Sequence, residues 1–382
     1  MFYLLEYFLQ TVTASFDPYT QLIFRNAGFS QSKVGVIIAA GQLASIFFPM
    51  IAGLLMDRTG KARIVLVVTS LASGVLIMPA TMSGVFPFVI FMFFLSRGFV
   101  SVINPAVDGY LTKCLKGDAQ KYGLARAAGT GGYVVFLVAA SVIGFPEVTD
   151  NRQILICYII SLVAFVVCVA FCPEMPQTEN KDHNHRFFDV NWFDKSFYVV
   201  MLAVGISRVA QTIPDRLLGS YMTEELHLGG HFPFYVAIGA FSEMLMLIIG
   251  GKLIREGKVS YYTMLILSTV ALIVRLYIYA YVKGKAAFIF AQTLHSFTYG
   301  ACHIAITNYI SLTTSKKHNA FAMSWYTALA TNFPQMLGVF FGGFIIDNFG
   351  YGSLFRIYGI FPVIALLILV VFRKTIILRR EK

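Results

Sequence analysis

Apolar runs of about twenty residues recur along nearly the whole chain, and they limit what it can fold into more than any other feature. A helix rises about 1.5 Å per residue, so a run of this length spans the roughly 30 Å hydrocarbon core of a bilayer. Only 13% of the 382 residues are charged, whereas an ordinary soluble domain has about 25%. The sequence therefore predicts an all-α membrane protein. Twelve transmembrane helices are expected, at approximately residues 4–25, 34–56, 63–83, 87–111, 122–144, 152–172, 196–222, 233–254, 260–282, 286–312, 320–346 and 352–373.

The net charge of +11 is placed asymmetrically along the chain. Of the 30 lysines and arginines, 19 fall in the C-terminal tail and in loops on one side of the membrane, and 5 fall in loops on the other side. Basic residues concentrate in cytosolic loops of membrane proteins, so both termini are predicted to be cytosolic. This placement explains the charge without nucleic acid, and membrane lipids are the expected surroundings.

A hydrophilic segment at 173–195 separates two sets of six expected spans. We interpret it as a cytosolic linker between two six-helix bundles, at 1–172 and 196–382. His183 and His185 within it resemble a metal tract, but an exposed linker is the favoured interpretation, and no metal or cofactor is expected. The chain has no CxxC, HExxH or phosphate-binding glycine pattern. An enzyme is therefore not expected.

Ten ionisable residues lie inside the expected spans. A charge at mid-bilayer costs about 2.5–3.5 kcal/mol, so such charges persist only where they are paired or face water. The sequence therefore predicts a polar cavity inside the membrane, and with it a path or site for a hydrophilic solute. The ten residues are Asp17, Arg97, Asp108, Arg126, Arg208, Asp215, Arg216, Glu243, Arg275 and Arg356.

The loop between the second and third expected spans reads Gly-Leu-Leu-Met-Asp-Arg-Thr-Gly-Lys-Ala-Arg over residues 53–63, and echoes of it follow at 251–258 and 343–350. This pattern resembles the signature loop of the major facilitator superfamily, which acts as a latch between two six-helix halves. Its aspartate can accept hydrogen bonds from a helix N-terminus across the interface. The resemblance implies this fold and alternating access. The expected latch residues are Gly53, Asp57, Arg58, Gly60, Lys61 and Arg63.

Two segments of the first half resemble the lactose permease branch, the oligosaccharide and nucleoside proton symporters. They are Asn-Pro-Ala-Val-Asp, ending at Asp108, and Tyr-Gly-Leu-Ala-Arg, ending at Arg126. In that branch an acid and an arginine eighteen residues later line the sugar site. The resemblance implies that Asp108 and Arg126 bind substrate. A plain ion pair that ties two helices together is the alternative.

Three segments of the second half also resemble this branch and the related phenylpropionate transporters. They contain Glu243, Arg275 and His295, at positions for substrate orientation and proton coupling. A histidine that is only hydrogen-bonded within the bundle is an equal alternative for His295. Where the branch has its proton-carrying acid, this chain has Thr298, so coupling would use other groups. The candidate coupling residues are Glu243, Asp215, Asp17, Arg275 and His295.

The remaining intramembrane charges leave alternatives open. Asp17 precedes Pro18 and forms either a cation, proton or amine site or an ion pair with an arginine of another span. Arg97 either binds an anionic group of the substrate or pairs with an acid elsewhere in the chain. Asp215 and Arg208 lie seven residues apart on nearly the same helical face, so a structural ion pair is favoured.

The favoured function is therefore a secondary active transporter, acting as a monomer in the bacterial inner membrane. It would import a small polar organic solute, such as a sugar, oligosaccharide or nucleoside, together with protons. A proton-coupled exporter of drugs or other compounds is one alternative, although the span-five glycine pattern of drug antiporters is absent. A transporter of an aromatic or small organic acid is another, and a membrane sensor that does not transport is a third.

Overall fold

The computed structural model describes residues 1–115, 119–173, 193–314 and 319–377. Within these ranges the chain is helical and contains no strand. Most of the expected linker, with His183 and His185, lies outside the described residues. The side chains of Asp57 and Arg58 lie outside them too.

Nine stretches of the described residues are long and apolar enough to cross a membrane. Seven are the single helices α3 (Gln31–Thr59), α4 (Ala62–Met82), α5 (Phe86–Cys114), α6 (Ala119–Ile143), α7 (Asn151–Ala170), α10 (Phe232–Arg255) and α11 (Tyr261–Tyr281). The eighth, Lys195–Glu225, begins with α8 (Lys195–Thr212) and includes α9 (Leu218–Ser220). The ninth, Phe321–Val371, includes α15 (Phe333–Tyr358) and α16 (Ile360–Val371) and covers two of the expected spans. Gly350 divides it, because its φ of +73° is not helical.

The other two expected spans are interrupted helices. Residues 4–25 fall in α1 (Phe2–Phe16), η1 (Asp17–Tyr19) and α2 (Thr20–Asn26). Pro18 has no N–H and disfavours helix at the residue before it, which explains the break. Residues 286–312 fall in α12 (Lys285–Thr293), η6 (Ser296–Ala301) and α13 (Cys302–Thr313). The total of twelve spans and the cytosolic position of both termini stay predictions.

Four π-helical segments interrupt the second half of the chain, and the sequence analysis did not predict them. Such segments are rare and frequently occur at functional sites. One holds Asp215 and Arg216, and another holds Thr298. They are η3 (Ile213–Leu217), η4 (Tyr221–Glu225), η6 and η7 (Ala328–Asn332). The short elements η5 (Gly229–His231), α14 (Asn319–Thr327) and α17 (Arg373–Ile377) are the remaining helices of the described residues.

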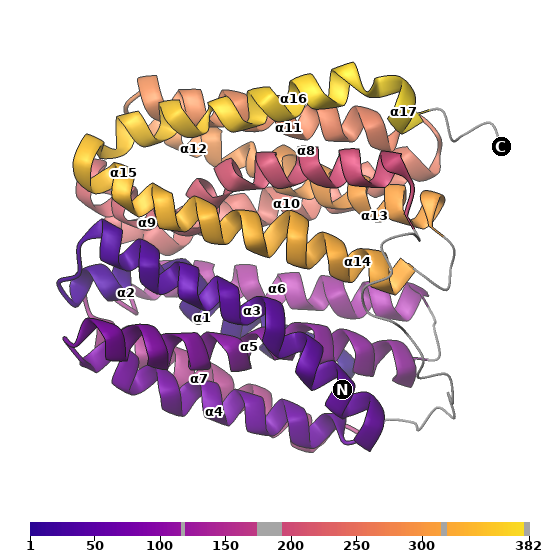
Figure 1. The fold of residues 1–382 in the computed structure, drawn as a ribbon. Helices are drawn as coiled ribbons and strands as arrows, with labels where there is room; N and C mark the ends of the chain where they lie inside the picture. Colours follow the sequence, from indigo (N-terminus) through magenta and orange to yellow (C-terminus); the bar gives the residue numbers. More distant parts are fainter. Residues whose placement is uncertain (116–118, 174–192, 315–318, 378–382) are drawn as a thin grey trace.

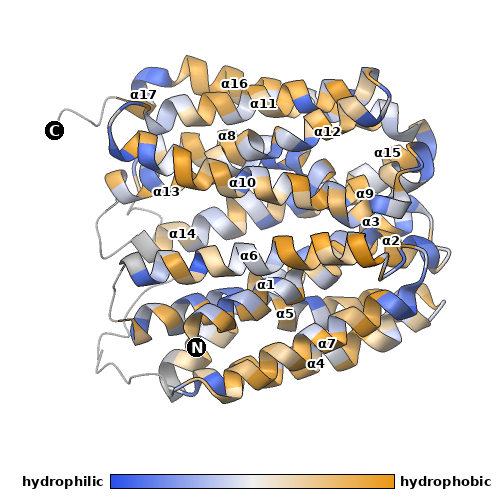
Figure 2. Cartoon of the chain, turned by 180° about the vertical axis from the view of Figure 1, so that it is seen from behind, coloured by the Kyte–Doolittle hydropathy of each residue, from blue (hydrophilic) through white to orange (hydrophobic). Residues whose placement is uncertain are grey.

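The helices before residue 173 and those after residue 195 form two groups that lie side by side (Figure 1). The groups meet along α3 with α15 and along α6 with α10. Glycine permits the first of these contacts, since a Cβ on Gly35 would lie 2.7 Å from the carbonyl oxygen of Val339. Hydrophobic residues line most of α4, α7 and α16 on the outside of the molecule (Figure 2).

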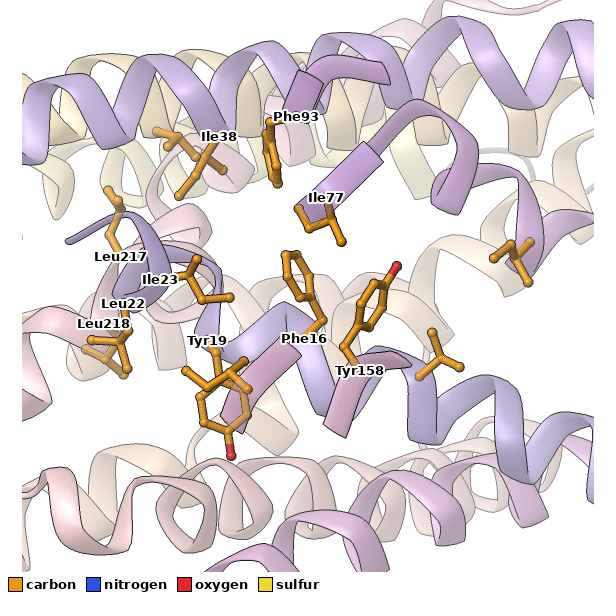
Figure 3. Packing of buried hydrophobic residues seen from close by; sticks show 14 of the residues in the cluster. Phe16, Tyr19, Leu22, Ile23, Ile38, Ile77, Phe93, Tyr158, Leu217 and Leu218 are labelled. Atoms are coloured by element: carbon orange, nitrogen blue, oxygen red, sulfur yellow. The ribbon is translucent and has the colours of Figure 1, made fainter. Parts of the chain in front are cut away.

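A buried hydrophobic cluster surrounds the break between α1 and α2 (Figure 3). Phe16, beside the break, packs against Tyr158 of α7 with ring centroids 4.7 Å apart. The Tyr158 hydroxyl is hydrogen-bonded to Ser73 of α4 at 2.6 Å. The same cluster includes Leu217 and Leu218 from the second half. The backbone around Asp17 is therefore packed from both halves.

A polar clamp joins the two halves between the start of α3 and Asp347 of α15, just before the interruption of α15 at Gly350. The Asp347 carboxylate accepts hydrogen bonds from the backbone N–H groups of Gln31, at 3.0 Å, and Ser32, at 2.7 Å, and from the Ser32 hydroxyl. It thereby caps the N-terminus of α3, where free N–H groups and the helix dipole favour an anion. Arg25 and Glu224 pair at the same end of the molecule, at 2.9 Å. Asp347 belongs to the second echo of the signature loop, at 343–350, and makes the kind of contact that was expected of Asp57.

The clamp provides a first prediction. Asp347→Ala removes both acceptor oxygens and the negative charge, so we expect the loss of about 0.5–2 kcal/mol that is typical of a removed N-cap. The melting temperature of the purified protein in detergent should fall accordingly. Asn348→Ala is the matched control, because Asn348 is exposed and bonds Phe344 of its own helix. Equal melting of the two variants would show that the clamp contributes nothing.

Candidate functional site

Arg126 lies between two carboxylates of the first half. Its Nη1 atom is 3.3 Å from Asp108 Oδ1 and 3.5 Å from Glu6 Oε2. Tyr122 donates to the same Asp108 oxygen at 2.9 Å. The structure therefore brings Asp108 and Arg126 together, as the sequence resemblance implied. We call these four residues the arginine cluster.

Glu6 was missed by the sequence analysis. It lies in α1, which packs against α6, and its side chain is fully buried. Neither carboxylate oxygen has a hydrogen-bond partner among the described residues. A Cβ on Gly129 would approach Glu6 Oε2 to 3.0 Å, so the absent side chain of Gly129 leaves room for the acid. The available signal was an acid early in an apolar run, which looks like the flank of a span.

Asp17 joins two arginines from different halves of the chain. Arg97 of α5 forms a bidentate ion pair with it, with Nη2 donating to Oδ2 at 3.0 Å. Arg216 of η3 donates to the same Oδ2 atom at 3.1 Å. The acid that Arg97 lacked in the sequence is thus Asp17, and the ion-pair alternative holds for both. A recess adjoins this triad and is lined by Thr13, Ser101 and Asn104 among others.

A third group links Glu243, His295 and Arg275 in the second half. His295 Nε2 lies 3.2 Å from Glu243 Oε2, and His295 Nδ1 lies 3.0 Å from Arg275 Nη1. Arginine can only donate, so Nδ1 is the acceptor and Nε2–H points at Glu243. Arg275 is buried and also donates to Gln292 at 2.8 Å and to the Thr298 hydroxyl at 3.2 Å. Thr298, which stands where the branch has its proton-carrying acid, is therefore a partner of Arg275.

The favoured ion pair of Arg208 with Asp215 is wrong. Asp215 instead accepts from Gln211, at 2.8 Å, and from Gln335 of α15, at 3.1 Å. Arg208 donates to the Tyr326 hydroxyl at 3.1 Å. The seven-residue spacing assumed a regular helix, whereas the π-helical turn of η3 begins between the two residues and rotates Asp215 toward α15.

Arg356 and the described latch residues form no hydrogen bond or ion pair with the charged groups above. Arg356 is exposed and bonds within its own helix, to the Gly352 carbonyl and the Ser353 hydroxyl. In the expected latch, Gly60 ends α3 with a φ of +67°, and Arg63 donates to the Ala170 carbonyl of α7 at 3.0 Å. That bond lies within the first half.

The latch role stays a prediction, because the side chains of Asp57 and Arg58 are outside the described part of the chain. Gly53 and Lys61 are described. A Cβ on Gly53 would meet no atom within 4 Å, so space alone does not require a glycine there. Lys61 is exposed and directly precedes α4.

The charged groups of both halves act on a common region. The ion pair of Asp17 with Arg216 joins the two halves directly, and α6, which carries Arg126, packs against α10, which carries Glu243. His303 of α13 stacks with Tyr299, with ring centroids 6.3 Å apart. The site is thus an internal polar region between two groups of membrane-spanning helices. A protein with this fold and this site belongs to the membrane transporters.

The comparisons with known proteins define this class further. Residues 1–357 match the MFS_1 like family, and the chain belongs to that family, which confirms the resemblance to the major facilitator superfamily. Over 353 residues the chain is 22% identical to a protein of Bacillus subtilis (strain 168) named uncharacterized transporter YwbF, covering 88% of this chain and 83% of that protein.

Solved transporter structures share the fold. A point mutant of the nucleoside transporter NupG superposes with a TM-score of 0.84 at 14% identity, covering 97% of this chain and 98% of that one. A bacterial homologue of the human lysosomal transporter Spinster, described as inward-facing and unoccupied, gives 0.75 at 13% identity, covering 100% and 96%. At these identities the likeness concerns the fold alone.

Proposed function

We propose that this chain imports a small polar organic solute, such as a sugar, oligosaccharide or nucleoside, together with protons, as a monomer in the bacterial inner membrane. The observation that carries the proposal is the arginine cluster, together with Glu243 and His295 in the opposite half. A guanidinium offers a planar fork of donors and carboxylates offer acceptors, which suits a ligand rich in hydroxyl groups. NupG, a nucleoside transporter with a similar fold, supports this substrate class.

Transport would proceed by rocking of bundles 1–172 and 196–382 about this site. With both termini in the cytosol, the Asp347 clamp and the Asp17 triad close the outer side. Exposure supports this orientation, since the side chains of Arg126 and Asp108 are 42% and 37% exposed, against 18% for Arg216 and 19% for Asp17. The arginine cluster is then the part of the site that faces the cytosol.

A second candidate substrate is an aromatic or small organic acid. It is favoured by the rings of His295, Tyr299 and His303, which stack in sequence within 17° of parallel. Arg208 lies over the Tyr299 ring, 4.7 Å from its centroid. Flat rings next to a cation would suit an aromatic carboxylate.

A thermal-shift screen of the purified protein tests the proposal. Sugars, nucleosides and aromatic acids are compared, and compounds that raise the melting temperature are then assayed for uptake into proteoliposomes. Uptake of a sugar or nucleoside that collapses when a protonophore dissipates the proton gradient is the expected result. Uptake that is indifferent to the protonophore would contradict proton coupling, and uptake of aromatic acids alone would favour the second candidate.

A further inference from the structure

Five acids lie within the helices that form the site, and four of them have donors that satisfy their charge. Asp17 accepts from two arginines, and Asp215 accepts from two amide groups. Glu243 faces the Nε2–H of His295, and Asp108 accepts from Tyr122 and Arg126. Each of these carboxylates is stable in its ionised form where it stands.

Glu6 is the exception. Both of its oxygens are buried without a hydrogen bond from the described residues, and its one cationic neighbour, Arg126, is shared with Asp108. One positive charge cannot neutralise two carboxylates. Burial of an unpaired ionised carboxylate is so unfavourable that the group binds a proton instead. Charge balance in the arginine cluster is therefore reached when Glu6 carries one proton.

Among the described residues, two charges on the helices packed against α1 act on Glu6. From α6, Arg126 and the neutral Tyr122 act on Glu6, and from α5 Asp108 does. The third neighbour, α7, contains a single charged residue, Arg152, close to its first turn. Met1 contacts Cys168 near the other end of α7, so Arg152 lies far from Glu6 along that helix.

We infer that Glu6 is the residue that carries the transported proton, in place of the acid that Thr298 replaces. This inference rests on the proposed function, since it assigns the coupling site within that mechanism. A proton bound to Glu6 leaves Arg126 paired with Asp108. When the proton leaves Glu6 for the cytosol, the ionised carboxylate takes Arg126 as its partner, so the substrate loses a donor and is released on the same side. Proton binding and substrate binding are then coupled through one guanidinium.

Infrared spectroscopy of the purified protein tests the protonation without a ligand. A protonated carboxylic acid has a carbonyl stretch that shifts in D₂O, and we expect this band at neutral pH in the parent protein. Glu6→Gln should remove it, whereas Glu147→Gln, which alters an exposed loop acid of the same half, should leave it unchanged. An unchanged band in Glu6→Gln would overturn the assignment.

Transport provides the second arm of the test. With a compound that the thermal-shift screen identifies, Glu6→Gln should exchange substrate across the membrane at equilibrium but lose uphill accumulation. A potential of 100 mV is worth about 2.3 kcal/mol per charge, or roughly 50-fold accumulation, and this factor should disappear. Accumulation equal to that of the parent would contradict the inference. Should no compound be transported at all, the proposed function fails while the infrared result still decides the protonation of Glu6.

Discussion

Arg126→Gln should reduce substrate uptake to the background level. The change removes the cation that Asp108 and Glu6 share, and it removes the fork of donors proposed to bind the solute. A hydrogen bond to a charged group contributes about 1.5–3 kcal/mol, so affinity should fall by roughly 10- to 150-fold for each bond lost. The change in melting temperature produced by the bound compound, and its uptake into proteoliposomes, measure the effect.

Arg126→Lys separates charge from geometry. Lysine keeps the positive charge near the two acids but cannot donate two parallel bonds to one partner. We therefore expect this variant to retain the stability of the parent protein and to bind the compound weakly. Arg356→Gln is the matched control, because within the described part of the chain Arg356 bonds only within its own helix. This variant should bind the compound as tightly as the parent protein does. Normal uptake by Arg126→Gln would move the substrate site to Glu243 and His295.

The membrane helices were largely predictable because the bilayer imposes one simple rule on a sequence. A run of apolar residues of sufficient length must be helical, since lipid offers the backbone no other hydrogen-bond partner. The same rule does not determine where a helix bends. Pro18 indicated the interruption at Asp17, whereas no residue type indicated the π-helical turn at 296–301.

The same distinction applies to the candidate site, where some residues were recognisable from the sequence and others were not. Asp108 with Arg126, and His295 with Arg275, were recognisable because family motifs place them on helices that face one another. The pairing of Arg97 with Asp17 was not, because 80 residues separate them and only tertiary packing joins them. The proposed pair of Arg208 and Asp215 failed because it was inferred from regular helical spacing. Glu6 was missed because an acid near the start of a span resembles one that reaches the membrane surface.

Asp17→Asn should cause the largest loss of stability of any of these single changes. The asparagine side chain is nearly the same size, so packing around Phe16 and Tyr158 is kept, but two largely buried arginines, 15% and 18% exposed, lose their counter-ion. Removing one partner of a buried ion pair costs about 3–5 kcal/mol. The protein should melt at a clearly lower temperature than the parent, and salt should restore little of the difference because the site is buried.

Variants of the two arginines that bind Asp17 separate the stability of the first half from closure of the contact between the halves. Arg97 joins Asp17 within the first half, whereas Arg216 joins it from the second half. Arg216→Gln should therefore keep most of the stability and weaken the contact between halves, while Arg97→Gln should lower stability without opening it. Spin labels at Lys33 and Asn348, which are exposed next to the clamp but make none of its hydrogen bonds, measure the opening as a longer distance in Arg216→Gln. A double-mutant cycle tests the same contact. The combined variant with Asp17→Asn and Arg216→Gln should lose less free energy of unfolding than the sum of the losses in the two single variants. Strict additivity would mean that the bridge between the halves carries no energy, and that the outer side is held closed by the clamp and by helix packing alone.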